Sequence, residues 1–378
     1  MRIVHLTPHL PPDQAANALL PYQLGEWAAA RGDTVLYVAH PPRAGASAAL
    51  PGDVTWVPRR QPSVWQKTVR VGSFAAAARI WRAAAPRIAS ADVVHIHSNG
   101  LLAEVGASIA LRLGKPYVLT LYGTEIWHYQ ARRGLDLFTR AYRGAAAVVF
   151  YSERLLLRAR ELALGRFDCH VIYPPVSASF TFHDWVGQQE ERLKLGISAR
   201  HLIVNVKRLH PLAGQHVLIE AMGEIVREHP DARLVICGTG ERLRDLQHGA
   251  RAAGVERHVV FAGLVDNTMV ARYCAAADLF ALPSLLEALP TVAVEALAAG
   301  TPVVSSDNPG GLELNDLFGR DVEIVPRENA LALADAIRAG LRDKRRTTPA
   351  TGKIVSERFR ADTVARQYWD VYDAIRRR

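Results

Sequence analysis

Two consecutive α/β domains, each built on a parallel sheet, are the fold that the sequence predicts. The chain has 378 residues, which is long enough for two domains with full cores. Short apolar runs typical of buried strands alternate with helical patterns through both halves of the chain. This alternation predicts doubly wound parallel sheets covered by helices, because parallel strands need crossover connections and helices usually provide them.

Five strands are predicted in the first half of the chain, at residues 3–6, 35–39, 93–96, 117–121 and 147–150. Helical patterns separate them at residues 18–31, 69–85, 101–113 and 135–143. The consecutive prolines Pro174 and Pro175 stop any helix and stiffen the chain. We therefore expect the connection between the two domains at residues 175–186.

Six strands are predicted in the second half, at residues 202–206, 234–237, 259–261, 279–282, 303–305 and 322–325. Helices are expected to begin near Gln215, Arg242, Asn267, Pro290 and Ala330. The last segment, residues 361–378, carries Trp369, Tyr372 and Ile375 at three-residue spacing. This spacing predicts an amphipathic terminal helix.

Composition argues against several classes of protein. Apolar residues make up 49% of the chain and charged residues 22%, as in ordinary globular proteins. The net charge of +9 comes mostly from scattered arginines without a nucleic-acid-binding motif, so no nucleic-acid partner is expected. No apolar run approaches the roughly 18–20 residues that a membrane helix needs.

The cysteines and the N-terminal segment favour a cytoplasmic location. Cys169, Cys237 and Cys274 are few and far apart, which fits a reducing compartment. The chain begins with a strand pattern, so no signal peptide is expected. It has no Asp-x-Asp triplet and no Cys/His cluster with metal-ligand spacing. We therefore expect no metal site.

Residues 284–304 combine features of an anion-binding site. Pro290 suits the first position of a helix, and Gly300 suits its end. Glu287 precedes this helix, and Glu295 lies about 7–8 Å down its axis at about 1.5 Å per residue. Free N–H groups at a helix start favour a phosphate, and two carboxylates there would hold hydroxyls on either side of a diphosphate. The simpler alternative is a solvated Glu287 and an internally paired Glu295.

This stretch resembles the donor-binding signature of retaining glycosyltransferase family 4, which is a Glu, seven residues, a second Glu and a small residue before Gly-Thr-Pro-Val-Val. The resemblance implies the GT-B fold, in which two Rossmann-like domains face a cleft and the C-terminal helix crosses back to the first domain. The expected domains are an acceptor-side domain at residues 1–180, a donor-binding domain at 187–355 and a terminal helix at 356–378.

The resemblance also implies roles for individual residues. Glu287 would contact hydroxyls of the donor sugar and Glu295 the ribose, while Arg208 would stabilise the leaving diphosphate. Catalytic roles fall on Glu287, Arg208 and Tyr122. The other donor-binding residues would be Lys207, Gly238, Leu264, Ala288, Leu289 and Thr291. The acceptor-side residues would be Ala16, Asn17, His97, Gly123 and Thr124. For Gly238, a plain tight turn is an equal alternative, and for His97 an ordinary packed histidine is one.

The sequence departs from the family pattern at several of these positions. Ala213 stands where a phosphate-binding Lys is usual, and Lys207 where a Gly is usual. Tyr122 replaces a His, Ala15 and Ala16 replace a Gly-Gly pair, and Ala288 replaces a Gly. Because a methyl group cannot neutralise a phosphate, either Lys207 or His210 substitutes for the missing Lys or donor affinity is poor.

Weak peripheral contact with the inner face of the membrane is a further expectation. In family members with lipid acceptors, a basic amphipathic helix of the first domain meets the bilayer. The corresponding residues here are Trp65, Lys67, Arg70, Arg79, Trp81, Arg82 and Arg87. At 100° per residue these cations spread around a helix, which favours an ordinary solvated surface over a peripheral membrane site.

The function that these observations predict is a metal-independent, retaining glycosyltransferase. It would move a sugar from a nucleotide-diphosphate-sugar co-substrate to a hydroxyl of a sugar, lipid-linked or small-molecule acceptor, with no further cofactor. One alternative is a non-catalytic sugar-nucleotide-binding protein of the same fold. A nucleotide-sugar epimerase is another, and it would convert the donor without any acceptor.

Overall fold

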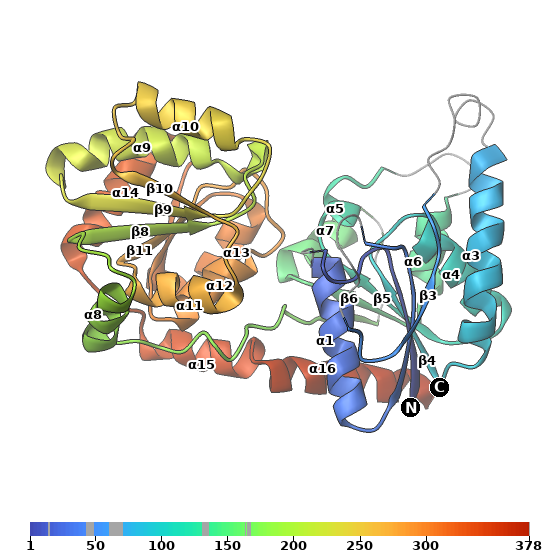
Figure 1. Ribbon diagram of the computed structural model, residues 1–378. Helices are drawn as coiled ribbons and strands as arrows, with labels where there is room; N and C mark the ends of the chain where they lie inside the picture. The colour runs from blue at the N-terminus through green and yellow to red at the C-terminus, as the bar shows by residue number, and fades with distance from the viewer. Residues whose placement is uncertain are drawn as a thin grey trace. The chain divides into compact units, whose positions relative to one another are not determined.

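The computed structural model describes residues 1–13, 16–42, 49–59, 71–130, 136–162, 164 and 168–377. The chain forms two compact units, each with its own sheet (Figure 1). Unit 1 contains Met1–Tyr173 and Val364–Arg378, and unit 2 contains Pro174–Thr363. The sequence placed these boundaries at 180 and 355, whereas the contacts place them at Tyr173 and Thr363.

Unit 1 is built on a seven-stranded parallel sheet in the order β3-β2-β1-β4-β5-β6-β7. Its strands are β1 (Arg2–Thr7), β2 (Thr34–Ala39), β3 (Asp53–Trp56), β4 (Val93–His97), β5 (Tyr117–Leu121), β6 (Ala147–Phe150) and β7 (Cys169–Val171). Sequence analysis missed β3 and β7, which are the two edge strands. Both are short and mostly half-buried, so neither shows the continuous apolar run of a central parallel strand.

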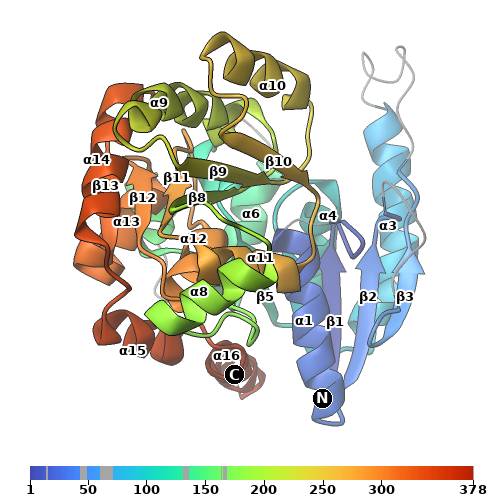
Figure 2. The same cartoon turned by 60° about the vertical axis from the view of Figure 1, so that its left-hand side comes forward.

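Helices cover both faces of this sheet (Figure 2). They are α1 (Ala16–Ala30), α3 (Val71–Ala89), α4 (Leu101–Arg112), α5 (Thr124–Trp127), α6 (Leu137–Gly144), α7 (Glu153–Glu161) and α16 (Ala361–Arg376). One apolar layer joins α3, α4, α6 and α7 to the sheet, and a second joins α1 and α16. The terminal helix α16 is therefore part of the core of unit 1, with Tyr368 and Tyr372 fully buried.

Unit 2 has a six-stranded parallel sheet in the order β10-β9-β8-β11-β12-β13, which is the Rossmann strand order. Its strands are β8 (His201–Val206), β9 (Ala232–Cys237), β10 (Val259–Gly263), β11 (Leu279–Leu282), β12 (Val303–Ser306) and β13 (Val322–Val325). All six correspond to strands that the sequence predicts.

The helices of unit 2 also lie on both faces of its sheet. They are α8 (Trp185–Lys194), α9 (Gln215–Glu228), α10 (Leu243–Ala252), α11 (Asn267–Ala276), α12 (Thr291–Ala298), α13 (Pro309–Phe318), α14 (Ala330–Asp343) and α15 (Pro349–Arg358). Two 3₁₀ turns, η1 (Pro211–Ala213) and η2 (Gly319–Asp321), complete the unit. Sequence analysis missed α8, α13 and α15.

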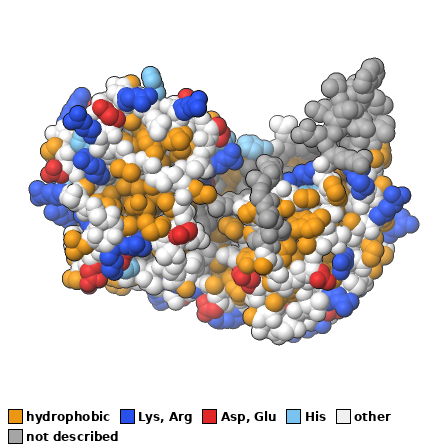
Figure 3. Space-filling view, in the orientation of Figure 1, with side chains coloured by type: hydrophobic (Ala, Val, Ile, Leu, Met, Phe, Trp, Pro, Cys, Tyr) orange, Lys and Arg blue, Asp and Glu red, His pale blue; other side chains and the backbone are white. Residues whose placement is uncertain are grey.

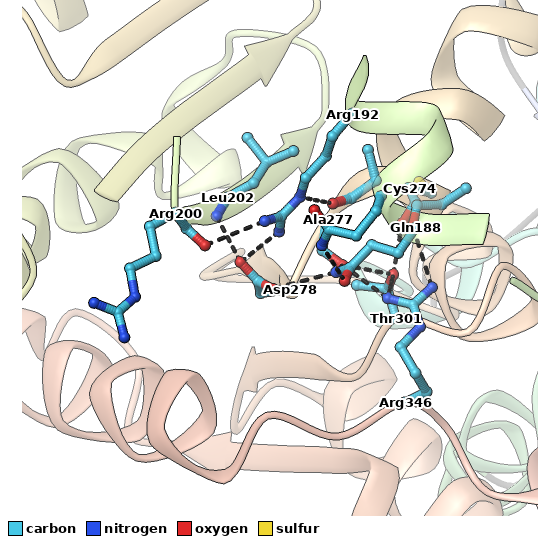
Figure 4. A network of polar contacts seen from close by, with 12 residues as sticks. Gln188, Arg192, Arg200, Leu202, Cys274, Ala277, Asp278, Thr301 and Arg346 are labelled. Carbon is cyan, nitrogen blue, oxygen red and sulfur yellow. Dashed lines mark hydrogen bonds and ion pairs between the residues drawn. The ribbon is translucent and has the colours of Figure 1, made fainter. Parts of the chain in front are cut away.

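A network of polar contacts ties α8, α11 and α12 to the start of β11 (Figure 4). Asp278 forms an ion pair with Arg192 of α8, with 2.6 Å between Oδ2 and Nη2. Arg346 donates hydrogen bonds to the carbonyl oxygens of Ala277 at 2.8 Å and Ala299 at 2.9 Å, which cap the C-termini of α11 and α12. Because helix C-termini carry partial negative charge, this guanidinium stabilises both ends. The network therefore fixes α12 from the end opposite its N-terminus.

The charged surface of each unit is mixed. Figure 3 shows Lys and Arg side chains scattered over the visible face of each unit rather than gathered into one block. Within the described part of the chain, no helix has the length and apolar character needed to cross a membrane.

Candidate functional site

The carboxyl ends of β8 and β11 lie side by side in the sheet of unit 2. The chain after β8 leads to β9 on one side and the chain after β11 leads to β12 on the other, so the two loops diverge here. Ligands of such sheets bind at this kind of divergence. A cavity of about 290 Å³ opens at this point. It is lined by Lys207, Arg208, His210, Leu212, Ala213, Leu286 and Glu287.

The N-terminus of α12 follows Glu287 closely and has no side-chain cap. Pro290 occupies the capping position rather than the first helical position that the sequence predicted. The neighbouring helix α13, by contrast, is capped by Asn308, which accepts a hydrogen bond from the N–H of Gly311 at 3.0 Å. A Cβ at Gly310 would lie 2.8 Å from the Cβ of Glu287, so glycine permits this close packing. The N–H of Ala293 donates to the carbonyl of Pro290 at 3.0 Å, and no described side chain caps the two N–H groups before it, which suits an anion there.

The loop before α12 is held by side chains at the end of β12. The carbonyl oxygen of Ser284 accepts a hydrogen bond from Nδ2 of Asn308 at 2.8 Å and another from the hydroxyl of Ser306. Sequence analysis assigned neither of these residues a role. The available signal was a run of polar residues, Ser305 to Asn308, directly at a strand end.

The charged side chains of the cavity form two ion-paired groups. Lys207 contacts Glu287 through its ammonium group, and their side chains are 29% and 12% exposed. Arg208 and His210 both face Glu241, at 3.4 Å and 3.7 Å, and the Arg208 side chain is 72% exposed. Lys207 is therefore the inner cation and Arg208 the outer one.

Glu295 lies on α12 and is half-buried. Its carboxyl group makes no hydrogen bond or ion pair with another described residue, so the alternative of an internally paired Glu295 does not hold for this structure. Burial raises the pKa of this carboxyl group to about 7. An unpaired, partly desolvated carboxylate is a strong acceptor for hydroxyl groups of a ligand.

The remaining predicted donor-binding residues follow strands β9, β10 and β11 of the same sheet. A Cβ at Gly238 would lie 2.1 Å from the carbonyl oxygen of Lys207, and the φ of Gly238 is +141°. Close packing of two loops thus explains this glycine without a phosphate. Leu264 follows Gly263, whose carbonyl accepts from the N–H of Gly238 at 2.7 Å, and its side chain is 62% exposed. Leu289 is buried, whereas Ala288 and Thr291 are half-buried.

In unit 1, Tyr122 and Gly123 follow β5 and are held by Glu125, a buried residue to which sequence analysis assigned no role. Its carboxylate accepts hydrogen bonds from the N–H of Gly123 at 2.8 Å and of Tyr122 at 3.2 Å. The hydroxyl of Ser98 donates to the same carboxylate at 2.5 Å. The N–H of Gly123 is therefore already occupied. Burial raises the pKa of the Tyr122 phenol well above its usual range, so this group stays neutral.

Three histidines gather behind Tyr122. His5, His95 and His97 are fully buried, and one ligand atom from each lies within 4.8 Å of the others. The spacing in the sequence hides this cluster because His5 comes from the neighbouring strand β1. Burial holds the pKa of His5 at about 3 and those of His95 and His97 well below their usual value, so the rings are neutral.

Both ring nitrogens of His97 are occupied inside the protein. Nδ1 is 2.7 Å from the Tyr122 hydroxyl and Nε2 is 3.0 Å from Nδ1 of His5. His95 is likewise bonded to Tyr372 at 2.6 Å and Thr120 at 2.7 Å. These surroundings match packed histidines, and His97 can reach an acceptor only through Tyr122.

The loop after β1 is described only in part. Ala15 lies outside the described residues, and so does the side chain of Thr124. Ala16 is exposed at the start of α1. Asn17 is half-buried, and its side-chain oxygen has no hydrogen-bond partner among the described residues.

Comparisons with known proteins identify the family of the chain. Residues 187–353 match the family described as Glycosyl transferases group 1, and residues 21–180 match Glycosyltransferase Family 4. One relative is TuaC of Bacillus subtilis (strain 168), which is named as a teichuronic acid biosynthesis glycosyltransferase. The two sequences are 31% identical over 299 aligned residues, and the alignment covers 76% of this chain and 68% of TuaC. The D-inositol 3-phosphate glycosyltransferase of Jonesia denitrificans is 31% identical over 307 residues, covering 75% of this chain and 72% of that protein.

Solved structures show the same fold. The structure of Anabaena HepE in complex with UDP has a TM-score of 0.77 at 20% identity and covers 99% of this chain and 100% of HepE. Sucrose-phosphate synthase from Thermosynechococcus elongatus also has a TM-score of 0.77 at 20% identity, with 99% of each chain covered. The protein is thus a GT-B glycosyltransferase, and the chain belongs to glycosyltransferase family 4.

Proposed function

We propose that the protein is a retaining glycosyltransferase that uses a nucleotide-diphosphate sugar as donor and needs no metal ion. The observation that carries this proposal is the arrangement at the ends of β8 and β11. Two cations and Glu287 line one cavity, and the uncapped N-terminus of α12 lies beside it. Positive charge and free N–H groups suit a diphosphate, whereas carboxylates suit the hydroxyls at its two ends.

Each group has a defined task in this proposal. Arg208 and Lys207 stabilise the negative charge that develops on the leaving diphosphate, which is electrostatic catalysis. Glu287 accepts hydrogen bonds from hydroxyls of the donor sugar, and Glu295 accepts them from the ribose. The acceptor hydroxyl attacks the same face of the sugar that the diphosphate leaves, and its proton passes to the departing phosphate oxygen. No side-chain base is then needed for this step.

The cations of the chain take the place that a divalent metal has in other sugar transferases. We therefore expect transfer to continue in the presence of a chelator. The described cysteines are all unpaired, which supports the proposal of a cytoplasmic reaction. The acceptor class in this proposal is a hydroxyl of a glycan, a glycolipid or a small molecule.

The first experiment is thermal unfolding with UDP, GDP, ADP and TDP, each with and without an attached sugar. A ligand at a hundred times its dissociation constant adds about 2.7 kcal/mol to folding stability. For a unit of this size such a gain raises Tm by several degrees. A shift with one base identifies the donor, and no shift with any of them would refute the proposed donor site.

Transfer itself is tested with the donor found in this way. Labelled donor and a panel of acceptors should give product with the wild-type protein and none with Glu287→Gln. An NMR assignment of the anomeric proton in donor and product should show retained configuration. Donor binding without any product would favour the non-catalytic sugar-nucleotide-binding alternative, and an inverted product would refute the retaining mechanism.

A further inference from the structure

We propose that Lys207 is a two-position cation that couples diphosphate binding to recognition of the donor sugar. Without ligand its ammonium group neutralises Glu287. When the diphosphate enters, the ammonium moves to the phosphates and releases Glu287 for the hydroxyls of the sugar. This inference rests on the proposed donor site and specifies how that site works.

The first argument is the distribution of charge in the cavity. Ala213 is buried at its wall and offers only a methyl group. Lys207 is the inner cation, with its side chain 29% exposed against 72% for Arg208. It lies in the same cavity as Ala213, so it can supply from the end of β8 the charge that residue 213 lacks.

His210 is less suited to this task because one of its ring nitrogens is already engaged and the other faces an acid. Nδ1 accepts a hydrogen bond from the N–H of Leu212 at 3.3 Å, which makes His210 the cap of the turn η1. Nε2 faces Glu241 at 3.7 Å. The accepting Nδ1 offers no proton to a phosphate, whereas the Lys207 ammonium group has three donors.

The second argument is that the backbone of Lys207 is fixed while its side chain is not. Its N–H donates to the carbonyl of Cys237 at 3.0 Å, and its own carbonyl packs against Gly238. The flexible side chain beyond this anchor ends at Glu287. Four methylene groups allow the ammonium to change partners without any movement of the strand.

The third argument is electrostatic. Glu287 is only 12% exposed, so it is poorly solvated once Lys207 leaves. A nucleoside diphosphate without a sugar takes the cation and leaves this carboxylate without a partner. A nucleotide sugar takes the cation and supplies hydroxyl donors to the carboxylate. The arrangement therefore favours the complete donor over the free nucleoside diphosphate product.

The test compares dissociation constants of a nucleoside diphosphate and its nucleotide sugar, measured by calorimetry on the full chain. Lys207→Met should weaken both by on the order of 10- to 100-fold, since a desolvated charge contact is lost. Lys207→Met combined with Ala213→Lys should recover most of this loss. Lys353→Met removes an exposed lysine on α15 and should bind as the wild type does.

Glu287→Gln gives the sharpest result because the two ligands should respond in opposite directions. The nucleoside diphosphate should bind more tightly, since Lys207 no longer has to leave a carboxylate. The nucleotide sugar should bind more weakly, since it loses an acceptor for its hydroxyls. Circular dichroism and Tm of each ligand-free variant control for misfolding.

Two outcomes would overturn the inference while the proposed function stands. One is wild-type affinity in Lys207→Met. The other is a Glu287→Gln variant that weakens both ligands equally. Failure of the wild-type protein to bind any nucleotide would instead refute the proposed function, so the two failures are distinguishable.

Discussion

Glu295→Gln should stabilise the folded protein at alkaline pH, and the gain should disappear at acidic pH. The wild-type carboxyl group is half-buried without a protein partner, and its pKa is about 7 against an ordinary value of 4.5. Between these two pKa values the folded state holds a proton that the unfolded state has released. Stability therefore falls as pH rises from 4.5 through about 7.

The magnitude follows from the difference between the two pKa values. Each pKa unit corresponds to about 1.4 kcal/mol, so the ionised carboxylate costs about 3 kcal/mol of unfolding free energy above pH 8. Near pH 5 the cost is below about 1 kcal/mol, because the folded carboxyl group is then protonated. Gln cannot ionise, so Glu295→Gln avoids this cost at any pH. Any fixed packing difference between Glu and Gln cancels when the two pH values are compared.

The assay is urea unfolding followed by circular dichroism at several pH values from about 5 to about 8. The variant should gain about 2–3 kcal/mol over the wild type between these limits. Glu220→Gln removes an exposed carboxylate from α9 and serves as the matched control, with no pH-dependent gain expected. The same stability difference at pH 5 and pH 8 would refute the argument that burial of Glu295 is costly.

The affinity for the donor should change with pH in the direction opposite to folding stability. In the proposed donor site the ionised carboxylate accepts hydrogen bonds from ribose hydroxyls, so the wild-type affinity for nucleotide should rise with pH through about 7. Glu295→Gln should lower the affinity at pH 8 and remove this pH dependence. A stabler variant with weaker binding would identify Glu295 as a residue whose burial is retained for function.

Three further predictions concern other parts of the chain. Arg346→Met should lower the Tm by several degrees because it removes the guanidinium hydrogen bonds to carbonyl groups at the C-terminal ends of α11 and α12. Arg342→Met removes an exposed ion-pair partner of Glu228 and should change the Tm little. Equal effects of the two variants would contradict the network's role. Tyr122→Phe should lower the rate of transfer and leave nucleotide affinity unchanged, and a wild-type rate would remove Tyr122 from the catalytic residues. When the protein is sedimented with anionic vesicles, only a small, salt-sensitive fraction should pellet with them. The reason is that Arg87 of α3 donates a hydrogen bond to Thr55 at 3.0 Å rather than facing outward. Pelleting of most of the protein with the vesicles would contradict this expectation.

The structure describes only some of the residues that the sequence associates with membrane contact. Arg79 is half-buried, whereas Trp81 and Arg82 are exposed on α3. Trp65, Lys67 and Arg70 lie outside the described residues. The expected spread of the cations around this helix therefore stays a prediction.

The sequence by itself determined the fold class and the central strands. Buried parallel strands such as 117–121 and 279–282 are continuous apolar runs, and this pattern is visible without any structure. The edge strands β3 and β7 and the helices α5, α7, α8, α13 and α15 were missed. Edge strands are short and partly exposed, and α8 begins within the segment that was predicted to be a connection.

The sequence also predicted where the two acids of the proposed donor site lie along the chain. The spacing of Glu287 and Glu295 around Pro290 predicts a helix with one acid before it and one within it, and the structure has this arrangement. Local spacing suffices here because all three residues lie on one short segment of chain.

Only the tertiary structure decided which side chains are already engaged. Lys207 and Glu287 are 80 positions apart in the numbering, yet they form an ion pair because β8 and β11 are neighbours in the sheet. His5 and His97 meet for the same reason, through the pairing of β1 with β4. Pairing between distant strands depends on the packing of the whole unit, which no local pattern records. The side chains that share a site, and those buried behind it, therefore follow from strand order rather than from sequence spacing.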